Sequence, residues 1–294
     1  MTLPQPTSNQ AYCTVSALQA GFLDLKLFIF IDNASPSDVL TTPSLSFLIQ
    51  HSASSKKMVV DLGLRKDGEN DPVPANRLKH ADRVNVPLDV VDSLRKGGLE
   101  PSDIDYVCLT HAHFDHIGDP KLFDKSTFVV GGETKKLLNP GYPEDPKAEF
   151  ASDLLPEGRT MFLDDGWKEV GPFKKAYDFY EDGSLYIIDA AGHLPGHVNV
   201  LARTSATGGW LFLGGDSAHH WNLITGESRI AHGVVGGTFP GGCAHLDREA
   251  SEEHLRRMKK FLEEERTKII IAHDEAWFRE NKDKAFWPKT IESL

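Results

Sequence analysis

The sequence predicts an α/β fold, and three observations support this class. Four short apolar runs have the length and composition of buried strands, at residues 105–110, 185–189, 210–213 and 268–271. Each run leads directly into polar side chains, as strands of open α/β sheets do at their carboxyl ends. Amphipathic patterns with helical spacing occur at residues 88–96 and 251–265.

The first part of the chain is predicted to be rich in β-structure. Apolar, partly alternating runs occur at residues 27–31, 45–50 and 57–61, and the last leads into Asp61-Leu62-Gly63. Residues 65–83 are rich in Asp, Asn, Pro and charge, and we expect a polar loop there. Gly97-Gly98 ends the predicted helix at 88–96.

Composition and charge are those of a globular protein, with 40% apolar and 26% charged residues in 294. The net charge of -11 disfavours binding to nucleic acid or to anionic membranes. Residues 1–12 lack the pattern of a signal peptide, and the apolar stretch 15–31 is too short and too interrupted to span a bilayer. We therefore expect a cytoplasmic protein that binds neither nucleic acid nor membranes.

Cysteine usage agrees with a reducing compartment. Cys13, Cys108 and Cys243 are odd in number and widely spaced, which argues against a disulfide framework and against a thiolate zinc site.

Two long segments interrupt the predicted elements. We expect one domain spanning residues 1–294, but segments 137–183 and 222–246 are long for plain connections, and the second is rich in glycine. Segments of this length often form lids, binding loops or small inserts. We expect such a role for both.

The densest chemical signal is His111-Ala112-His113-Phe114-Asp115-His116, which directly follows the predicted strand 105–110. Imidazole nitrogen and carboxylate oxygen both bind zinc well. A tight loop could turn His111 and His113 toward one metal, and Asp115 and His116 toward a second one nearby. Incidental surface histidines would rarely give this spacing, because the chain has only 13 histidines. The motif therefore predicts a metal site.

The pattern His-Xaa-His-Xaa-Asp-His resembles the signature of the metallo-β-lactamase superfamily. Further motifs stand in that family's order: Asp61-Leu62-Gly63, Gly192-His193-Leu194-Pro195-Gly196-His197, Phe212-Leu213-Gly214-Gly215-Asp216 and Ile271-Ala272-His273-Asp274. The resemblance implies the family's four-layer αβ/βα fold, in which two mixed β-sheets are sandwiched between helices.

The resemblance also implies the metal ligands. The first metal would be held by His111, His113 and His193, the second by Asp115, His116 and His273, and both by a bridging Asp216. Two Zn²⁺ per chain are expected, and Fe or Mn is compatible with the same ligands. His197 is expected beside the ligands and not among them.

The activity implied is hydrolysis of a cyclic ester or amide, namely a lactone, a γ-lactam or a cyclic carbamate such as a benzoxazolinone. A metal-bridging hydroxide would attack the carbonyl, and Asp115 would orient it and shuttle a proton. Acyl-homoserine lactonases and fungal enzymes that open benzoxazolinone-type γ-lactams are both compatible. In the former, a tyrosine lies three residues after the bridging aspartate, where this chain has His219. His219 either donates a comparable hydrogen bond to the substrate or lies on the surface with His220.

Two alternatives stay open. A glyoxalase II-like thiolester hydrolase would use the same ligands, but the residues after His273 show no counterpart of the basic, tyrosine-bearing helical part that binds glutathione. A non-catalytic metal-binding module would keep the ligands without turnover.

The expected partner is a small molecule, and the sequence is compatible with a monomer or a homodimer. Three aromatic residues near the ligands in sequence are expected to line an apolar pocket: Trp221, Phe239 and Trp277.

Overall fold

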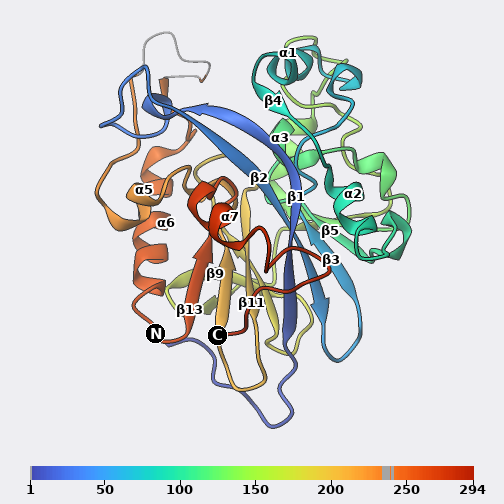
Figure 1. The fold of residues 1–294 in the computed structure, drawn as a ribbon, viewed down its shortest axis with the longest axis vertical. Helices are drawn as coiled ribbons and strands as arrows, with labels where there is room; N and C mark the ends of the chain where they lie inside the picture. Colours follow the sequence, from blue (N-terminus) through green and yellow to red (C-terminus); the bar gives the residue numbers. More distant parts are fainter. Residues whose placement is uncertain (1, 234–238, 240–241) are drawn as a thin grey trace.

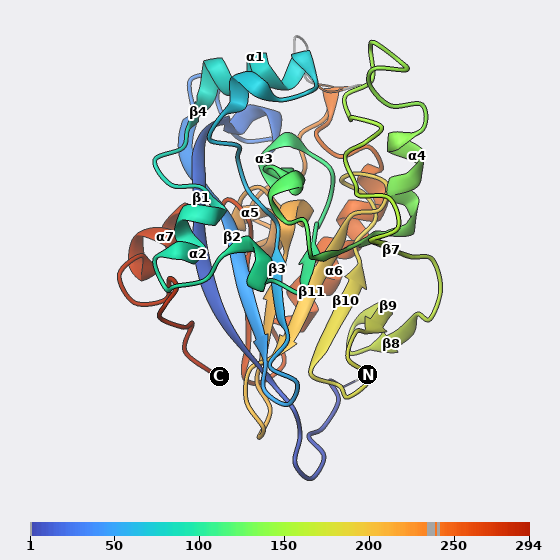
Figure 2. The same ribbon diagram turned by 90° about the vertical axis from the view of Figure 1, so that its right-hand side faces the viewer.

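The computed structural model describes residues 2–233, 239 and 242–294. Two mixed β-sheets pack face to face, and helices cover their outer faces (Figure 1, Figure 2). The first sheet has the strand order β4-β1-β2-β3-β5-β6-β7, and the second has the order β13-β12-β11-β10-β9-β8. This is the four-layer arrangement that the sequence predicted.

The strands pair mostly with antiparallel neighbours. The first sheet contains β1 (Cys13–Lys26), β2 (Val39–His51), β3 (Lys57–Val60), β4 (Val84–Asn85), β5 (Tyr106–Cys108), β6 (Thr127–Gly131) and β7 (Thr160–Leu163). The second contains β8 (Lys168–Val170), β9 (Phe173–Asp178), β10 (Leu185–Asp189), β11 (Val198–Arg203), β12 (Trp210–Leu213) and β13 (Thr267–Ile270). The parallel pairs are β3 with β5, β5 with β6, β6 with β7, and β12 with β13.

The helices are short, apart from two. The α-helices are α1 (Pro74–Arg83), α2 (Val90–Arg95), α3 (Phe114–Ile117), α4 (Lys135–Leu138), α5 (Trp221–Thr225), α6 (Arg248–Phe261) and α7 (Glu275–Asn281). The 3-10 helices are η1 (Leu27–Ile29), η2 (Gly68–Asn70), η3 (Pro101–Asp103), η4 (Pro120–Leu122), η5 (Gly132–Thr134) and η6 (Gly215–Ser217). Of the helices described, none combines the length and the apolar character that a bilayer span requires.

The main core lies between the two sheets. The first sheet contributes Phe47 and Met58, and the second contributes Ile187, Val200 and Leu211. All five are buried, and each buried side chain of this size contributes about 1.5–3 kcal/mol to folding. This shared core fixes one sheet against the other.

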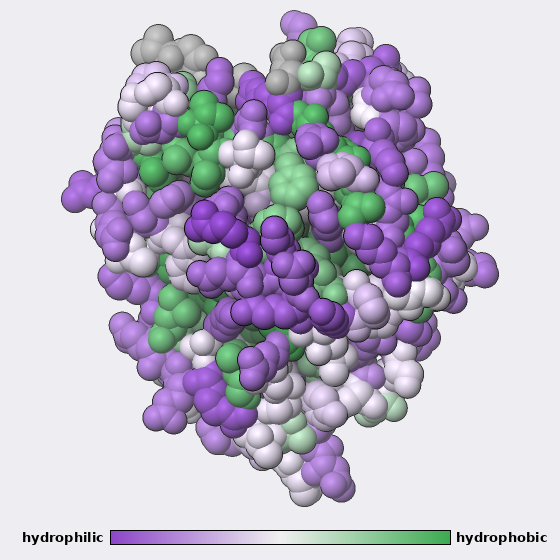
Figure 3. Space-filling view, viewed as in Figure 1, coloured by the Kyte–Doolittle hydropathy of each residue, from purple (hydrophilic) through white to green (hydrophobic). Residues whose placement is uncertain are grey.

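Each sheet also buries its outer face under a helix. Helix α6 packs Leu255, Met258 and Phe261 against the second sheet, because their spacing of three residues puts them on one helical face. Helix α2 covers the first sheet with Val91 and Leu94. On the molecular face in Figure 3, hydrophilic residues predominate and hydrophobic residues gather in several separate places, as is usual for a face in contact with water.

Several predicted elements are confirmed. Strands β10 and β12 have the predicted bounds, and β5 and β13 lie within one or two residues of theirs. The predicted helices at 88–96 and 251–265 correspond to α2 and α6.

Two predictions in the first part of the chain were wrong. Residues 27–31 do not form a strand, because the amides of Phe30 and Ile31 both donate locally to Leu27 O and so form η1. Residues 65–83 are not only a loop, since η2 and α1 lie there. Helix α1 begins at Pro74, which the first turn tolerates, and its Leu78 is 69% exposed, so no apolar periodicity marks it.

The two unassigned segments differ in content. Segment 137–183 holds β7, β8 and β9, which lie at one end of each sheet. Segment 222–246 contains most of α5, and part of its glycine-rich run lies outside the described residues. The single-domain organisation and the lid or insert roles stay predictions.

The turn Asp61-Leu62-Gly63 after β3 holds the histidine-rich loop against the first sheet. Leu62 N donates to His116 O at 2.8 Å, and Gly118 N donates to Gly63 O at 2.9 Å. Gly63 has φ +66°, and a Cβ atom there would lie 2.2 Å from Ala20 Cβ. Only glycine fits this position without displacing β1.

We expect Gly63→Ala to destabilise the fold by about 2–5 kcal/mol, because the methyl group would overlap Ala20 and because L-residues disfavour this φ. Gly98→Ala is the matched control, since Gly98 has φ +78° and an added methyl group would meet nothing within 4 Å. The control should lose only about 1–2 kcal/mol. Denaturant unfolding measures both, and equal losses would contradict the steric argument.

Candidate metal centre

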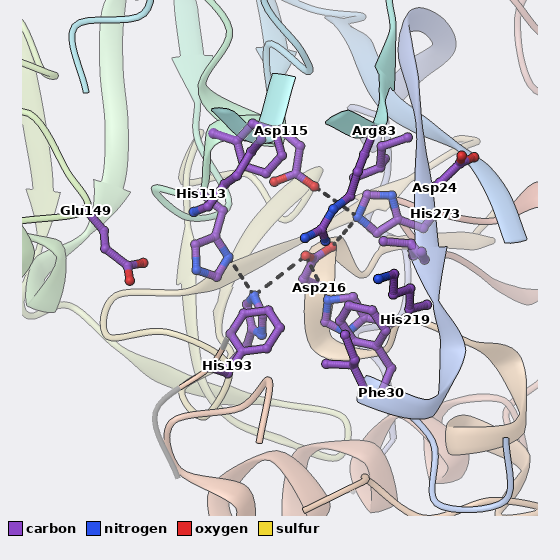
Figure 4. Close-up of a pocket in the computed structure, with 17 residues that line it drawn as sticks. Asp24, Phe30, Arg83, His113, Asp115, Glu149, His193, Asp216, His219 and His273 are labelled. Carbon is purple, nitrogen blue, oxygen red and sulfur yellow. Dashed lines mark hydrogen bonds and ion pairs between the residues drawn. The ribbon is translucent and has the colours of Figure 1, made fainter. Parts of the chain in front are cut away.

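The predicted metal ligands lie together at the carboxyl ends of strands, where the two sheets meet (Figure 4). The loop that carries His111 to His116 follows β5 of the first sheet. In the second sheet, His193 follows β10, Asp216 follows β12 and His273 follows β13. Because β10, β12 and β13 run in the same direction, their ends present these side chains at one edge.

A first cluster joins three histidines to Asp216. His113 Nδ1 lies 2.9 Å from Nε2 of both His111 and His193. Asp216 Oδ2 lies 3.6 Å from the same two Nε2 atoms. The four ligand atoms lie within 4.8 Å of one another, which is close enough for one cation to contact all of them.

A second cluster uses the other oxygen of Asp216. Asp216 Oδ1 lies 3.2 Å from His116 Nε2 and 3.3 Å from His273 Nε2. Asp115 Oδ2 lies 3.5 Å from His273 Nε2 and 3.9 Å from His116 Nε2. Asp216 thus directs one carboxylate oxygen toward each cluster.

The donor atoms of the second cluster fit a cation. His116 Nε2, His273 Nε2 and Asp216 Oδ1 are buried, and none has a hydrogen-bond partner among the described residues, because their contacts lack hydrogen-bond geometry. A buried polar atom left unpaired costs about 1–3 kcal/mol. Imidazole nitrogens and carboxylate oxygens are the donors that zinc, iron and manganese accept. The residues present therefore fit divalent cations.

The electrostatics of the clusters also favour positive charge. Burial lowers the pKa of His111 and His193 well below the usual value, so both are neutral and keep a lone pair for a cation. Burial also lowers the pKa of His113, to about 4. Burial opposes ionisation of Asp216, yet His116 and other neighbouring histidines hold its pKa well below the usual value. The first cluster thus combines neutral imidazoles with an ionised carboxylate, as metal binding requires. In the second cluster, burial opposes protonation, yet Asp216 raises the pKa of His116 and His273, so a cation binding there would displace protons.

Asp61 orients one histidine of the second cluster. His116 Nδ1 donates to Asp61 Oδ2 at 2.8 Å, which turns His116 Nε2 toward Asp216. Asp61 also accepts hydrogen bonds from Thr110 N and Thr110 Oγ1, both at 2.7 Å. Asp61 thus connects the turn after β3 to the loop that carries His116.

Two further contacts fix the second sheet's ligands. His273 Nδ1 donates to Pro43 O at 3.0 Å, so its Nε2 faces the cluster. His197 Nε2 accepts from Asp216 N at 3.2 Å, and His197 Nδ1 donates to Ala190 O at 3.2 Å. His197 thus lies beside Asp216.

His219 lies inside the site, so the surface alternative was wrong for it. Its side chain is buried, with Nε2 3.1 Å from Asp216 Oδ2, and its ring stacks on Phe30 with centroids 4.2 Å apart. His220 has a different role, because its Nδ1 accepts from Asn222 N at the start of α5.

Sequence reasoning missed His245, which is buried beside the first cluster. Its ring centroid lies 5.1 Å from that of His193 and 5.5 Å from that of His219. His245 Nδ1 lies 3.0 Å from Ser251 Oγ. Its only sequence signal was a histidine in the unassigned segment 222–246, which no motif connects to the ligands.

A cavity of about 120 Å³ opens onto both clusters. Its apolar lining is Leu23, Leu25, Ile29, Phe30, Phe114 and Phe239. Of the three aromatic residues predicted to line a pocket, only Phe239 does so. Trp277 is buried in the core between the sheets, and Trp221 Nε1 donates to Asp274 Oδ2 at 2.6 Å.

Two mixed sheets between helices, with histidine and aspartate clusters at their common edge, define the metallo-β-lactamase type of fold. Residues 40–273 match the sequence model of the Metallo-beta-lactamase superfamily. The chain belongs to that superfamily, and the predicted family and fold are confirmed.

Similar proteins include two fungal ones. The chain is 37% identical over 195 residues to Gamma-lactamase FDB1 of Fusarium pseudograminearum (strain CS3096), covering 62% of this chain and 47% of that protein. It is 30% identical over 289 residues to Metallo-hydrolase mfmC of Annulohypoxylon moriforme, covering 86% of this chain and 74% of that protein. The chain thus spans about half the length of the first of these relatives.

The fold resembles that of a solved quorum-quenching N-acyl homoserine lactone hydrolase. The TM-score is 0.68 at 19% identity, with 99% of each chain covered. At this identity the likeness concerns the fold.

We expect Asp61→Asn to weaken zinc binding by about 10–100-fold, because His116 loses the carboxylate that orients it. Asparagine keeps the shape and tolerates the positive φ of 58° at this position. Competition with a chromophoric chelator measures the affinity. Asp153→Asn, at an exposed pair with Lys121, is the control and should bind zinc like the wild type. Equal affinity of the two variants would contradict the orienting role.

Proposed function

We propose that this chain is a dinuclear zinc hydrolase that opens a cyclic ester or amide, such as a lactone, a γ-lactam or a cyclic carbamate of the benzoxazolinone kind. The observation that carries the proposal is the position of Asp216, which directs one oxygen toward each of two histidine-containing clusters. The relative named as a gamma-lactamase supports the substrate class.

The residues that would hold the cations are divided between the clusters. His111, His113 and His193 would hold the first, Asp115, His116 and His273 the second, and Asp216 both. Bound zinc ions would polarise the substrate carbonyl and lower the pKa of a water molecule, which makes it a nucleophile near neutral pH. Iron or manganese would suit the same donors.

The chain's own residues would orient the reactants and move the proton. Asp115 lines the cavity, and its Oδ2 belongs to the second cluster. Its other carboxylate oxygen would accept a proton from the nucleophile and return it to the leaving group. His219 lines the same cavity, and its Nε2 lies 3.1 Å from Asp216 Oδ2. It would position the bridging carboxylate and contact the substrate carbonyl.

The cavity fits a small cyclic substrate. Its volume of about 120 Å³ is several times what a single bound water needs, so it admits a small organic molecule. The apolar side chains from β1 and η1 would hold the ring and exclude water from the reacting carbonyl.

We expect Asp115→Asn to lower kcat by about 10²–10⁴-fold, because the amide cannot accept the proton. The assay uses zinc-loaded protein and a panel of lactones, γ-lactams, benzoxazolinone and S-lactoylglutathione. Asp153→Asn serves again as the control. Undiminished turnover in Asp115→Asn would overturn its assigned role.

The same panel separates the alternatives. Turnover of the thiolester alone would favour the glyoxalase II-like activity. Two zinc ions per chain with no turnover of any substrate would favour the non-catalytic metal-binding module.

We expect His219→Ala to lower kcat by about 10–100-fold, equivalent to a barrier higher by about 1–3 kcal/mol, with an unchanged zinc content. Steady-state kinetics and elemental analysis test both parts. His220→Ala is the matched control, because the imidazole of His220 caps the start of α5. An unchanged kcat would remove His219 from the machinery, whereas loss of zinc would assign it solely to holding Asp216.

A further inference from the structure

Helix α1 presents two basic side chains to the cavity above the candidate metal centre. Lys79 and Arg83 both line this cavity, and their spacing of four residues puts them on one face of the helix. In Figure 4, the Arg83 side chain points from α1 toward the group formed by Asp115, His273 and Asp216. The positively charged side chains of Lys79 and Arg83 therefore face the place where a substrate would bind.

Among the side chains that the structure describes, neither Lys79 nor Arg83 forms an ion pair with a carboxylate. Two nearby arginines that do not face the cavity have partners in the protein. Arg65 pairs with Asp67 at 3.1 Å and with Asp119 at 3.2 Å. Arg77, on the same helix, donates to Asp71 O at 2.6 Å. The guanidinium of Arg83 faces the cavity, where its N–H groups can donate to a bound group.

The remaining charges of the cavity leave a positive excess. If cations engage Asp115 and Asp216, as the proposed function requires, the other acidic lining residues are Asp24 and Glu149. The basic ones are Lys26, Lys79 and Arg83. Asp24 is partly committed, since its Oδ1 accepts a hydrogen bond from Thr41 Oγ1. Such a lining attracts an anionic ligand and repels a cationic one.

The kind of anion follows from the chemistry of the two side chains. A guanidinium presents parallel N–H donors that match a carboxylate in a bidentate pair. Lys79 lies over the ring of Phe114, with Nζ 5.3 Å from the ring centroid, so it adds positive charge at an apolar wall. The cavity thus offers a cationic side on α1 together with the apolar side chains from β1 and η1.

We infer that Arg83, supported by Lys79, forms a carboxylate-binding subsite, and that the preferred substrate is a small cyclic ester or amide bearing a carboxylate outside the reacting ring. The ring rests on the apolar side chains of β1 and η1 while Arg83 holds the carboxylate. This inference rests on the proposed hydrolase function for the identity of the reacting group.

The first test compares pairs of γ-lactones and γ-lactams that differ only in a substituent, which is a carboxylate or its methylamide. Zinc-loaded wild type is expected to prefer the carboxylate member by about 10–100-fold in kcat/KM. Arg83→Gln should remove this preference through a higher KM for the carboxylate member, and leave the methylamide member within about twofold. Arg83→Lys should retain part of it, since the charge stays but the bidentate geometry is lost.

The matched control is Arg77→Gln, which removes a cation from the same helix outside the cavity and should keep the full preference. Wild type without a preference, or an equal loss for both members in Arg83→Gln, would overturn the subsite.

The second test measures binding without turnover. Zinc-loaded protein is titrated with benzoate and with benzamide in an isothermal titration calorimeter. Benzoate should bind at least about tenfold more weakly to Arg83→Gln than to Arg77→Gln. Benzamide should bind equally to both variants. Because zinc attracts benzoate equally in both variants, the difference reports on Arg83 alone. Equal benzoate affinity would contradict the inference.

The two tests separate failure of the subsite from failure of the function. If no cyclic substrate reacts but benzoate binding depends on Arg83, the hydrolase function fails and the subsite stands. If cyclic substrates react but neither readout depends on Arg83, the function stands and the subsite fails.

Discussion

The site depends on the carboxylate of Asp216, whose two oxygens face two different clusters. Sheet pairing fixes its position, because β12 lies between β11 and β13. His273 follows the end of the neighbouring strand β13, and His193 lies in the turn between β10 and β11. The backbone amide of Asp216 also donates to His197, so the residue is held at both its main chain and its side chain.

The second constraint is the contact between the two sheets. The histidine-rich loop belongs to the first sheet, whereas Asp216 and two of the histidines around it belong to the second. The apolar core between the sheets therefore sets the distances within both clusters. Asp61 also fixes the orientation of one ring, because it accepts a hydrogen bond from His116 Nδ1 and so turns Nε2 of His116 toward Asp216.

The sequence predicted the two side-chain clusters better than the walls of the cavity. The clustered residues follow strands of high apolar content, so both motif and strand were visible. Strand β1 was hidden, because its register shifts between Gln19 and Phe22 and breaks the alternation. Helix α1 was hidden because few of its side chains are buried, so it lacks an apolar stripe. His245 reaches the site only through tertiary packing, which no local pattern records.

The division of the ligands along the chain has a consequence for the order of assembly. Residues 111–116 carry four of the seven predicted ligands within a span that ribosomal synthesis completes early, whereas Asp216 and His273 emerge more than a hundred residues after it begins. Until its last strands dock, a nascent chain would therefore offer only part of the proposed ligand set. If the chain binds metals as proposed, tight binding would require the finished fold, and the bound metals would stabilise it.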